Sequence, residues 1–318
     1  MRRIAAAMLG VLAMTAAAQD YPAKPVKIVV GYGAGGTADI TVRLVAEKLA
    51  ARMGQQFLVE NRPSAGGIVA ARELAAAAPD GYTLGLVAAG TSAISPTLFK
   101  SLPFDPVKDF AMVSQMAAFG YVFVVRADAP YRALGDLVAD AKARPGRVNI
   151  GTVQIGSAQF LEAELFKSAA GVDATIVPYK TSPDALTALR AGDVAVWLET
   201  IAPAIGQMRS GALRALAVTS GTRFGGLPGV PTVAEAGIPG CAADGWNGIA
   251  APAKTPRALI ERLNREINAV LAVPDVQARF LDLGIVAKGG TPDDLRNLLV
   301  AEIRKWGNVI VRANIPRQ

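Results

Sequence analysis

The pattern of apolar and polar positions changes period early in the chain, and the change frames a run of glycines. Residues 26–30 are apolar apart from Lys27, which predicts a buried strand. Residues 39–53 repeat apolar positions every three or four residues, which predicts a helix that Gly54 ends. Between them, residues 31–36 hold four glycines, of which Gly31, Gly33 and Gly36 have the spacing G-x-G-x-x-G. The segment therefore predicts a strand, a glycine loop and a helix.

Two more predicted strands follow, separated by a predicted helix. The stretch "QFLVE" reads as a strand, "NRPSAGG" leads into an alanine-rich helix, and "PDGYTLGLV" is a turn followed by a third strand. The order β-α-β-α-β is typical of a parallel, doubly wound sheet. Such sheets bind ligands at the carboxyl ends of their strands.

A similar pattern restarts after about Arg126. A helix ending in Pro-Gly, the strand "VNIGT", a loop and helix ending at Gly171, and the strand "ATIVPY" come first. A helix capped by Ser182 and Pro183 and the strands "VAVWLE" and "LRALAVTS" complete the series. These elements predict a second α/β unit.

The end of the chain predicts a return to the first unit. A strand and turn begin near Trp246, and three helices follow. Because helices without a sheet have nothing to cover, we expect a discontinuous domain of residues 19–125 and 245–318, with 126–244 inserted as a second domain. Each domain is expected to hold a doubly wound, mainly parallel sheet. Two crossings between them predict a cleft with a hinge.

The N-terminus has the features of a secretory signal peptide. Arg2 and Arg3 precede a short apolar core, and Ala16 and Ala18 occupy the positions of a cleavage site. The core is well short of the ~20 apolar residues that a membrane-spanning helix needs. We therefore expect residues 1–18 to be removed and the mature protein to act in the periplasm.

Charge and composition exclude several functions. The net charge is +7, or +5 without Arg2 and Arg3, and is spread thinly, so nucleic-acid binding is not expected. The absence of histidine excludes Ser-His-Asp and Cys-His catalysis and His-based zinc sites. The single cysteine, Cys241, has no internal partner and is expected to be a packed residue. We expect no catalytic residue, no metal and no cofactor.

Several motifs in order resemble one known family. The stretches "YPAKPVKIVVGYGAGGTADI", "LVENRPSAGG", "APDGYTLGLV", "VPYK" and "LPGVPTVAEAGIPG" followed by "WNGIAAPAKTP" are similar to the Bug-type receptors of the tripartite tricarboxylate transporter group. The resemblance covers essentially the whole mature chain. It implies a periplasmic solute-binding protein of the two-domain type II fold, which closes its cleft on a small organic anion.

The same resemblance implies how the protein works. It implies capture of a carboxylate or dicarboxylate for uptake or for sensing, with backbone amides and ordered water holding the ligand. The implied partner is a membrane permease or a sensor kinase, and the receptor is expected to be a monomer.

The glycine loop has two interpretations. With Glu60 after the next strand it satisfies a crude dinucleotide pattern, and the alternative function is an exported nucleotide-dependent enzyme. The same glycines and helix N-terminus also suit a carboxylate, which we favour because NAD is scarce outside the cytoplasm. The candidate residues of this loop are Tyr32, Gly33, Gly35, Gly36 and Asp39, and Asp39 is expected chiefly to stabilise the turn.

Other candidate ligand contacts come from equivalent places in the predicted architecture. They are Ala89, Gly90 and Thr91 after the third strand, Gly156, Ser157 and Gln159 at a helix N-terminus, and Tyr179, Thr181 and Glu199 at strand ends. Each polar residue has a structural alternative: helix capping for Thr91 and Ser157, packing for Tyr179, and a solvated or ion-paired acid for Glu199. Trp246 is a candidate for lining the hinge or for packing.

The chain departs from the family pattern near the expected site. It has "GYGAGG" where relatives tend to have "PFPPGG", so Tyr32 and Gly33 are expected to reshape the pocket. Thr181 replaces the glycine usual after the lysine and should narrow it. Ala188 and Ala195 stand where acids are common, which disfavours amines. We therefore expect a plain carboxylate or dicarboxylate ligand rather than an amino acid.

Overall fold

The first half of the molecule is built on the strand, glycine loop and helix that the sequence predicts. The computed structural model describes residues 21–318, so the expected signal peptide and its cleavage site at Ala18 lie outside the described residues. Strand β1 (Val26–Val30) is mostly buried. Helix α2 (Thr37–Met53) ends at Gly54, whose φ of 73° suits a residue without a β-carbon.

Two strands flank β1 and complete the predicted β-α-β-α-β unit. Both β2 (Phe57–Asn61) and β3 (Thr83–Ala88) pair with β1 in parallel. The intervening and following helical segments are η1 (Ala65–Gly67), α3 (Ile68–Ala76), η2 (Ala89–Ile94) and α4 (Ser95–Leu98). The carboxyl ends of β1 and β3 therefore lead directly into the glycine loop and into η2.

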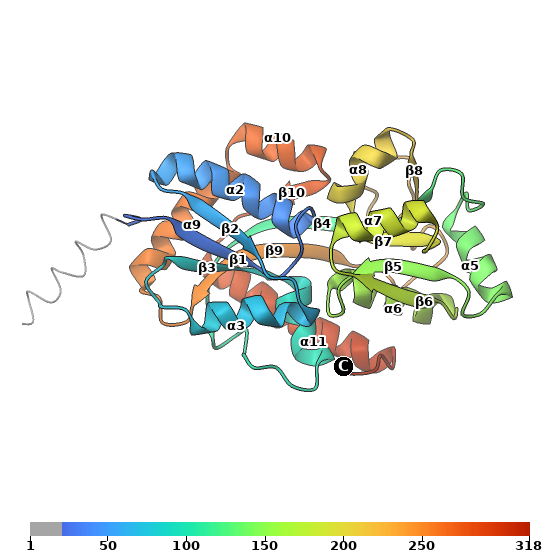
Figure 1. Cartoon of the computed structure of the whole chain (residues 1–318), viewed down its shortest axis with the longest axis horizontal. Coiled ribbons are helices and arrows are strands. Elements are labelled where there is room, and N and C mark those ends of the chain that lie inside the picture. The colour runs from blue at the N-terminus through green and yellow to red at the C-terminus, as the bar shows by residue number, and fades with distance from the viewer. Residues whose placement is uncertain (1–20) are drawn as a thin grey trace, which may run out of the picture.

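One long strand joins the two halves. β4 (Phe110–Arg126) has 17 residues. From Phe110 to Gly120 it pairs with β9 (Asp244–Pro252), and from Tyr121 onward with β7 (Val196–Thr200), in both cases antiparallel. Short strands β8 (Leu213–Val218) and β10 (Ile285–Ala287) also pair with β4. Figure 1 shows β4 and β9 running through the middle of the molecule.

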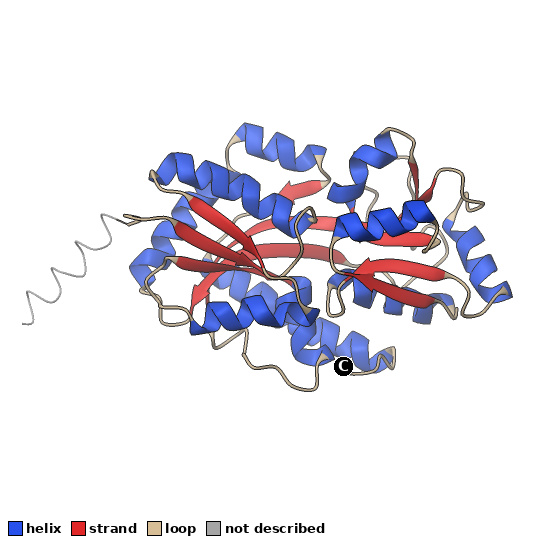
Figure 2. Ribbon diagram, in the orientation of Figure 1, coloured by secondary structure: helices blue, strands red, loops and turns tan. Residues whose placement is uncertain are grey.

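The second half repeats the parallel arrangement. β5 (Asn149–Val153) pairs in parallel with β6 (Thr175–Tyr179) and with β7. Its helices are α5 (Leu134–Ala143), α6 (Ala158–Ala170), α7 (Ser182–Ala191) and α8 (Ile201–Arg209). The strand order is β2-β1-β3-β9-β4-β7-β5-β6, with helices on both faces (Figure 2). The α/β class is confirmed; the sheet is mixed, because β4 and β9 run antiparallel to their neighbours.

Three helices follow β9, as predicted. They are α9 (Arg257–Leu271), α10 (Pro274–Asp282) and α11 (Pro292–Arg312). Buried residues of α9 and α10 share a hydrophobic core with β1 and α2, and α11 contacts β4 and η2. The terminal helices thus cover the sheet of the first half. We call β1–β3, β9 and β10 with α2, α3 and α9–α11 the first lobe, and β5–β8 with α5–α8 the second lobe.

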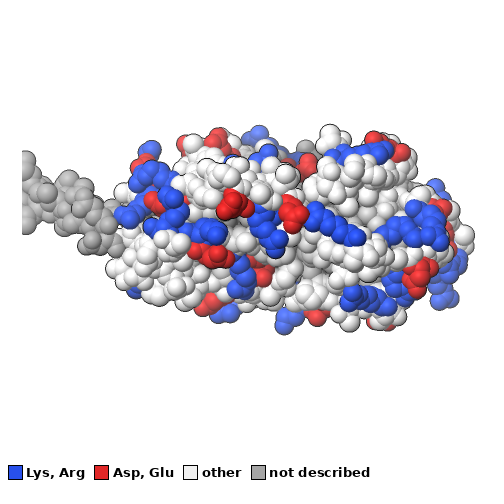
Figure 3. Space-filling model, turned by 90° about the horizontal axis from the view of Figure 1, so that it is seen from above, with Lys and Arg blue, Asp and Glu red and all other residues white. Residues whose placement is uncertain are grey.

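The surface carries both signs of charge. In the face shown in Figure 3, basic and acidic side chains are interspersed. Oppositely charged side chains of the molecule also form ion pairs, for example Arg52 with Glu266. Within residues 21–318, no helix has both the length and the apolar character needed to cross a bilayer. Cys241 is fully buried and unpaired, as expected for a packed residue.

Candidate functional site

The glycine loop of the first lobe lies directly against the second lobe. A β-carbon on Gly33 would lie 2.5 Å from Cγ2 of Thr181, and one on Gly36 would lie 3.1 Å from Oγ of Ser182. Gly35 has a φ of 83°, which residues with a β-carbon rarely adopt. Glycine is therefore required here chiefly because the loop packs closely against the side chains of Thr181 and Ser182.

A narrow cavity lies between the lobes beside this loop. The space open to the centre of a water molecule is about 40 Å³, so the cavity is narrow. The first lobe, β4 and β9 contribute Tyr32, Gly33, Gly36, Thr37, Ala38, Ala88, Ala89, Gly90, Phe119, Tyr121, Trp246 and Asn247. The second lobe contributes Val153, Gln154, Ala158, Gln159, Lys180, Thr181, Ser182 and Thr200. The cavity thus lies at the carboxyl ends of parallel strands and at helix N-termini, as the fold predicts.

Half of the residues predicted as ligand contacts line this cavity. They are Tyr32, Gly33, Gly36, Ala89, Gly90, Gln159 and Thr181. The other half lie beside or behind the lining: Gly35, Asp39, Thr91, Gly156, Ser157, Tyr179 and Glu199. Contact of any of these residues with a ligand stays a prediction.

Tyr32 reaches into the cavity from the glycine loop. The residue is half-buried, but its hydroxyl lies deep, since a β-carbon on Gly90 would be only 2.5 Å from that oxygen. Burial raises the pKa of the Tyr32 phenol above its usual value, although hydrogen bonding to Thr91 opposes the shift. Tyr32 therefore presents a neutral hydroxyl next to Gly90.

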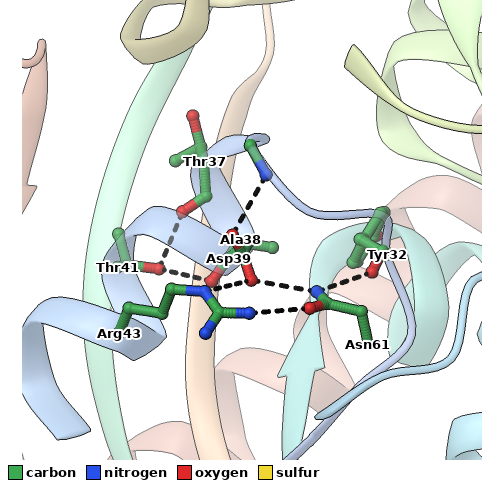
Figure 4. A network of polar contacts seen from close by, with 8 residues as sticks. Tyr32, Thr37, Ala38, Asp39, Thr41, Arg43 and Asn61 are labelled. Carbon is green, nitrogen blue, oxygen red and sulfur yellow. Dashed lines mark hydrogen bonds and ion pairs between the residues drawn. The ribbon is translucent and has the colours of Figure 1, made fainter. Parts of the chain in front are cut away.

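Asp39 holds the glycine loop in shape. Its carboxylate accepts hydrogen bonds from the Gly35 amide at 3.0 Å, from Nε of Arg43 at 2.9 Å and from Nδ2 of Asn61 at 3.0 Å (Figure 4). The Asn61 amide also donates to the Tyr32 carbonyl. Burial acts to raise the pKa of Asp39, but these donors outweigh it and hold the pKa below its usual value. The carboxylate thus faces the loop's own backbone and α2.

Glu199 is the centre of a polar cluster in the second lobe. It is fully buried and accepts hydrogen bonds from Nε2 of Gln159 at 2.7 Å and from Oγ of Ser182 at 2.6 Å. It also accepts from the amide of Thr200 at 2.7 Å and from its hydroxyl at 2.9 Å. Burial raises the pKa of Glu199, and the four donors oppose the shift. All three partners line the cavity, so Glu199 positions the side chains of the wall.

Several hydrogen bonds connect the lobes, and two of them involve side chains that line the cavity. Oγ1 of Thr37, the first residue of α2, donates to Oγ1 of Thr200 at 2.7 Å. Nε2 of Gln154 donates to the carbonyl oxygen of Gly31 at 2.9 Å. Because Thr200 in turn donates to Glu199, one chain of hydrogen bonds runs from α2 into the buried cluster.

The remaining predicted residues support the wall or lie outside it. Ser157 is the N-cap of α6, accepting from the Phe160 amide at 3.1 Å. Gly156 has a φ of 82° and packs so closely on Gly66 that a β-carbon would lie 2.8 Å from its Cα. Tyr179 borders a separate, more open hollow beside Pro63. Ser157 therefore caps α6, and Gly156 allows close packing on Gly66.

The cavity contains unused hydrogen-bonding capacity and little charge. Nε1 of Trp246 and Oδ1 of Asn247 are buried without a partner in the structure. Lys180 is the only charged residue among those that line the cavity in the described chain. Nowhere in residues 21–318 do three or more His, Cys, Asp or Glu side chains form a group that could hold a metal ion. The site offers donors, a neutral acceptor and one positive charge.

Sequence reasoning missed several residues of the wall. Thr37 and Ser182 are the first residues of α2 and α7, so the argument from helix N-termini could have included them. Thr200 directly follows Glu199 at the end of β7. Asn247 had a weaker signal, a lone amide inside the apolar run of β9.

Known proteins similar in sequence to this chain belong to one receptor family. The family model TctC, described as "Tripartite tricarboxylate transporter family receptor", matches residues 41–315. BugT of Bordetella pertussis is 35% identical over 311 residues, which cover 96% of this chain and 95% of BugT.

Two solved structures are also similar. Rpa4515 of Rhodopseudomonas palustris, solved with adipate, has a TM-score of 0.90 and 33% identity, covering 93% of this chain and 99% of Rpa4515. MatC of the same organism, solved with malate, has a TM-score of 0.87 and 31% identity, covering 91% of this chain and 100% of MatC. These relatives are binding proteins rather than enzymes. The chain belongs to the receptor family of the tripartite tricarboxylate transporters, a family of periplasmic solute-binding proteins.

Proposed function

We propose that this protein captures a small carboxylate or dicarboxylate between its two lobes. The observation that carries the proposal is the cavity itself, which lies beside the glycine loop and the N-termini of α2, α6 and α7. Backbone N–H groups at such positions favour anions. Lys180 adds a positive charge, and no acidic side chain is among the lining residues described.

The relatives support the same class of ligand. Rpa4515 was solved with adipate and MatC with malate, and both compounds are dicarboxylates. A plain acid also fits the neutral lining better than an amino acid does, since an ammonium group would meet no free carboxylate there. We therefore place dicarboxylates first among the ligands.

We assign the predicted residues two roles. Those that line the cavity contact the ligand: Tyr32, Gly33, Gly36, Ala89, Gly90, Gln159 and Thr181. The others act through neighbours, as Asp39 does through the loop and Glu199 through Gln159 and Ser182. Gly35, Thr91, Gly156, Ser157 and Tyr179 do not line the cavity, so we assign them the second role, action through their neighbours.

Closure would pivot where the chain crosses between lobes. The proposed domains are residues 19–125 with 245–318, and 126–244. Inside β4 the pairing partner changes from β9 to β7 between Gly120 and Tyr121, which supports a hinge at that point. The return crossing leads into Asp244, the first residue of β9.

Family membership and the N-terminal sequence support a proposal for where the protein acts. We propose that the protein is exported to the periplasm and cleaved near Ala18. We also propose that the receptor is a monomer that delivers its ligand to a membrane permease or presents it to a sensor kinase. Fractionation of cells that make the full chain tests export, because mature protein must then appear in the periplasmic fraction.

A thermal-shift screen tests the proposed function. Mature protein from Gln19 onward, refolded to remove any retained ligand, is titrated with mono-, di- and tricarboxylates, amino acids, aromatic acids and NAD. A ligand that binds only the folded state raises the melting temperature as its concentration rises. We expect a dicarboxylate to do so. A shift for NAD and for none of the acids would instead support the nucleotide interpretation of the glycine loop.

A pair of lysine variants checks that binding occurs in the cavity. Lys180→Gln removes the charge from the lining, whereas Lys142→Gln removes one from the last turn of α5, away from the cavity. We expect the first to weaken binding and to reduce its salt dependence, and the second to do neither. Equal effects would contradict the assigned site.

A further inference from the structure

Asn247 lines the cavity and holds an acceptor without a partner, and the hydrogen bond to its neighbour Thr41 fixes the orientation of the amide. Asn247 is fully buried in β9, and Nδ2 donates to Oγ1 of Thr41 at 2.7 Å. The Thr41 hydroxyl donates to the carbonyl of Thr37 at 2.9 Å or of Ala38 at 3.0 Å. Since a hydroxyl has one hydrogen, the Thr41 oxygen can only accept from Asn247. The amide therefore holds its nitrogen toward α2 and leaves Oδ1 free.

The free oxygen lacks the partner that a buried acceptor normally has. Oδ1 of Asn247 has no hydrogen-bond partner in the structure, and Asn247 lines the cavity. Buried acceptors in native proteins are nearly always satisfied, and an unsatisfied one costs free energy. A carboxylate cannot supply the missing bond, because it has no hydrogen to donate.

The chemistry of the lining selects the kind of donor. An ammonium group would be buried in the cavity with no acidic residue among those described in its lining. The nearby Glu199 already accepts from Gln159, Ser182 and Thr200. A neutral hydroxyl donates equally well to Oδ1 and carries no such desolvation cost.

We propose that Asn247 is a specificity-determining residue that selects hydroxycarboxylates by accepting a hydrogen bond from the ligand hydroxyl. The inference rests on the proposed function, because it concerns the same cavity. It adds that the ligand carries a hydroxyl group besides its carboxylates.

Matched acid pairs test this inference by calorimetry. Wild-type protein is titrated with L-malate against succinate and with L-lactate against propionate, each pair differing by one hydroxyl. Leaving Oδ1 unsatisfied should cost at least about tenfold in affinity, so one hydroxy acid should bind at least that much more tightly than its partner. L-aspartate provides the corresponding amine.

Variants assign the preference to Asn247. Asn247→Leu removes the acceptor, so we expect its affinities for the two acids of a pair to agree within about twofold. The control is Asn264→Leu, because Asn264 donates to the carbonyls of Val113 and Gly290 and does not line the cavity. It should keep the wild-type ratio. Thr41→Val releases the amide of Asn247 from its fixed orientation, so it should lower the ratio of the affinities for the hydroxy acid and its partner. This variant replaces Asn247→Leu in the test if Asn247→Leu does not fold.

The outcomes separate the inference from the proposed function. If carboxylates bind but hydroxy and deoxy acids bind equally, Asn247 does not select a hydroxyl and only the inference fails. If aspartate binds more tightly than malate, the donor is an ammonium group and the inference is also wrong. If no carboxylate binds, the proposed function fails and the inference with it.

Discussion

Thr181 fills the space that a β-carbon on Gly33 would need, since that carbon would lie 2.5 Å from its Cγ2. The two residues meet where the glycine loop of the first lobe touches the N-terminus of α7. The resemblance to Bug-type receptors implies a proline at the first position and a glycine at the second, and this chain has neither. The small residue and the larger one have exchanged sides of one contact, so the fit between the lobes is kept.

We expect this exchange to be measurable as a coupling between the two positions. Gly33→Ala should lower the free energy of unfolding by about 1–3 kcal/mol, because overpacking forces the loop away from α7. Thr181→Gly alone should cost only a few tenths of a kcal/mol for its lost N-cap bond to Asp184. In the double variant the added methyl has room, so most of the loss should be recovered. Urea unfolding of the four proteins measures the coupling.

A control separates this contact from alanine substitution in general. Gly135, near the start of α5, has open space where its β-carbon would lie, with no atom within 4 Å. Gly135→Ala should therefore not destabilise the protein and should not couple with Thr181→Gly. Strictly additive effects of Gly33→Ala and Thr181→Gly would mean that the loop relaxes freely around the methyl group.

The sequence predicted most helices and strands of the two halves, but it missed two strands, β4 and β10. Local patterns identified β1 because it is a short apolar run ahead of the glycine loop, and α2 and the three terminal helices because their apolar positions recur along the helix. β4 was not predicted: it has 17 residues and is buried at most positions, so it lacks a clear alternation. β10 has only three residues, and its pairing with β4 is set by tertiary contact. Pairing between distant segments leaves little trace in local sequence.

For the site, the sequence identified where residues lie in the fold but not which way their side chains point. It placed Asp39 and Glu199 at the correct ends of helix and strand, yet their carboxylates face internal donors rather than the cavity. Which atoms of Asn247 stay free depends on Thr41, which is 206 residues away in the chain. Such relations follow only from the packing of α2 on β9.

The hydrogen bond between Thr37 and Thr200 should hold the lobes together without ligand. Thr37→Val keeps the shape but removes the donor, which should cost about 1–3 kcal/mol at this buried position. Small-angle scattering of the ligand-free variant should give a larger radius of gyration than the wild type. Thr187→Val, which removes an exposed hydroxyl bonded to the Pro183 carbonyl within α7, is the matched control. Identical scattering of all three proteins would show that this bond does not control closure.

Two substitutions of Glu199 distinguish a hydrogen-bond centre from a required charge. Glu199→Gln keeps an oxygen for Gln159 and Thr200 and places an amide toward Ser182, whose hydroxyl can rotate to accept. Because burial raises the pKa of Glu199, we expect this variant to lose at most about 1 kcal/mol of stability. Glu199→Ala leaves several donors without an acceptor and should lose about 3 kcal/mol or more.

Chemical denaturation and ligand titration of both variants test this expectation. The glutamine variant should also retain affinity, because the cavity wall stays in place, while the alanine variant should lose it. If glutamine proves as damaging as alanine, the ionised carboxylate itself must be needed in the cluster.

Glu162 should make stability depend on pH. It is fully buried in α6, and neither carboxylate oxygen has a hydrogen-bond partner in the structure. Burial raises the pKa of Glu162 from 4.5 to about 8; Asp244 and Glu302 add to the shift, and Lys305 opposes it. The folded protein therefore keeps a proton that the unfolded chain releases above about pH 4.5.

The sign of the effect follows from that retained proton. The stability associated with Glu162 is fully present below about pH 4.5 and is lost progressively as the pH rises to about 8, where the folded protein also ionises. Glu162→Gln cannot ionise, so its free energy of unfolding should fall less between pH 5 and pH 8 than that of the wild type, by a few kcal/mol. Glu164→Gln, on the same helix but bridged to Lys167 at a partly exposed position, should follow the wild-type curve. Urea unfolding at several pH values measures the slopes; parallel curves for wild type and Glu162→Gln would mean that Glu162 does not retain the proton.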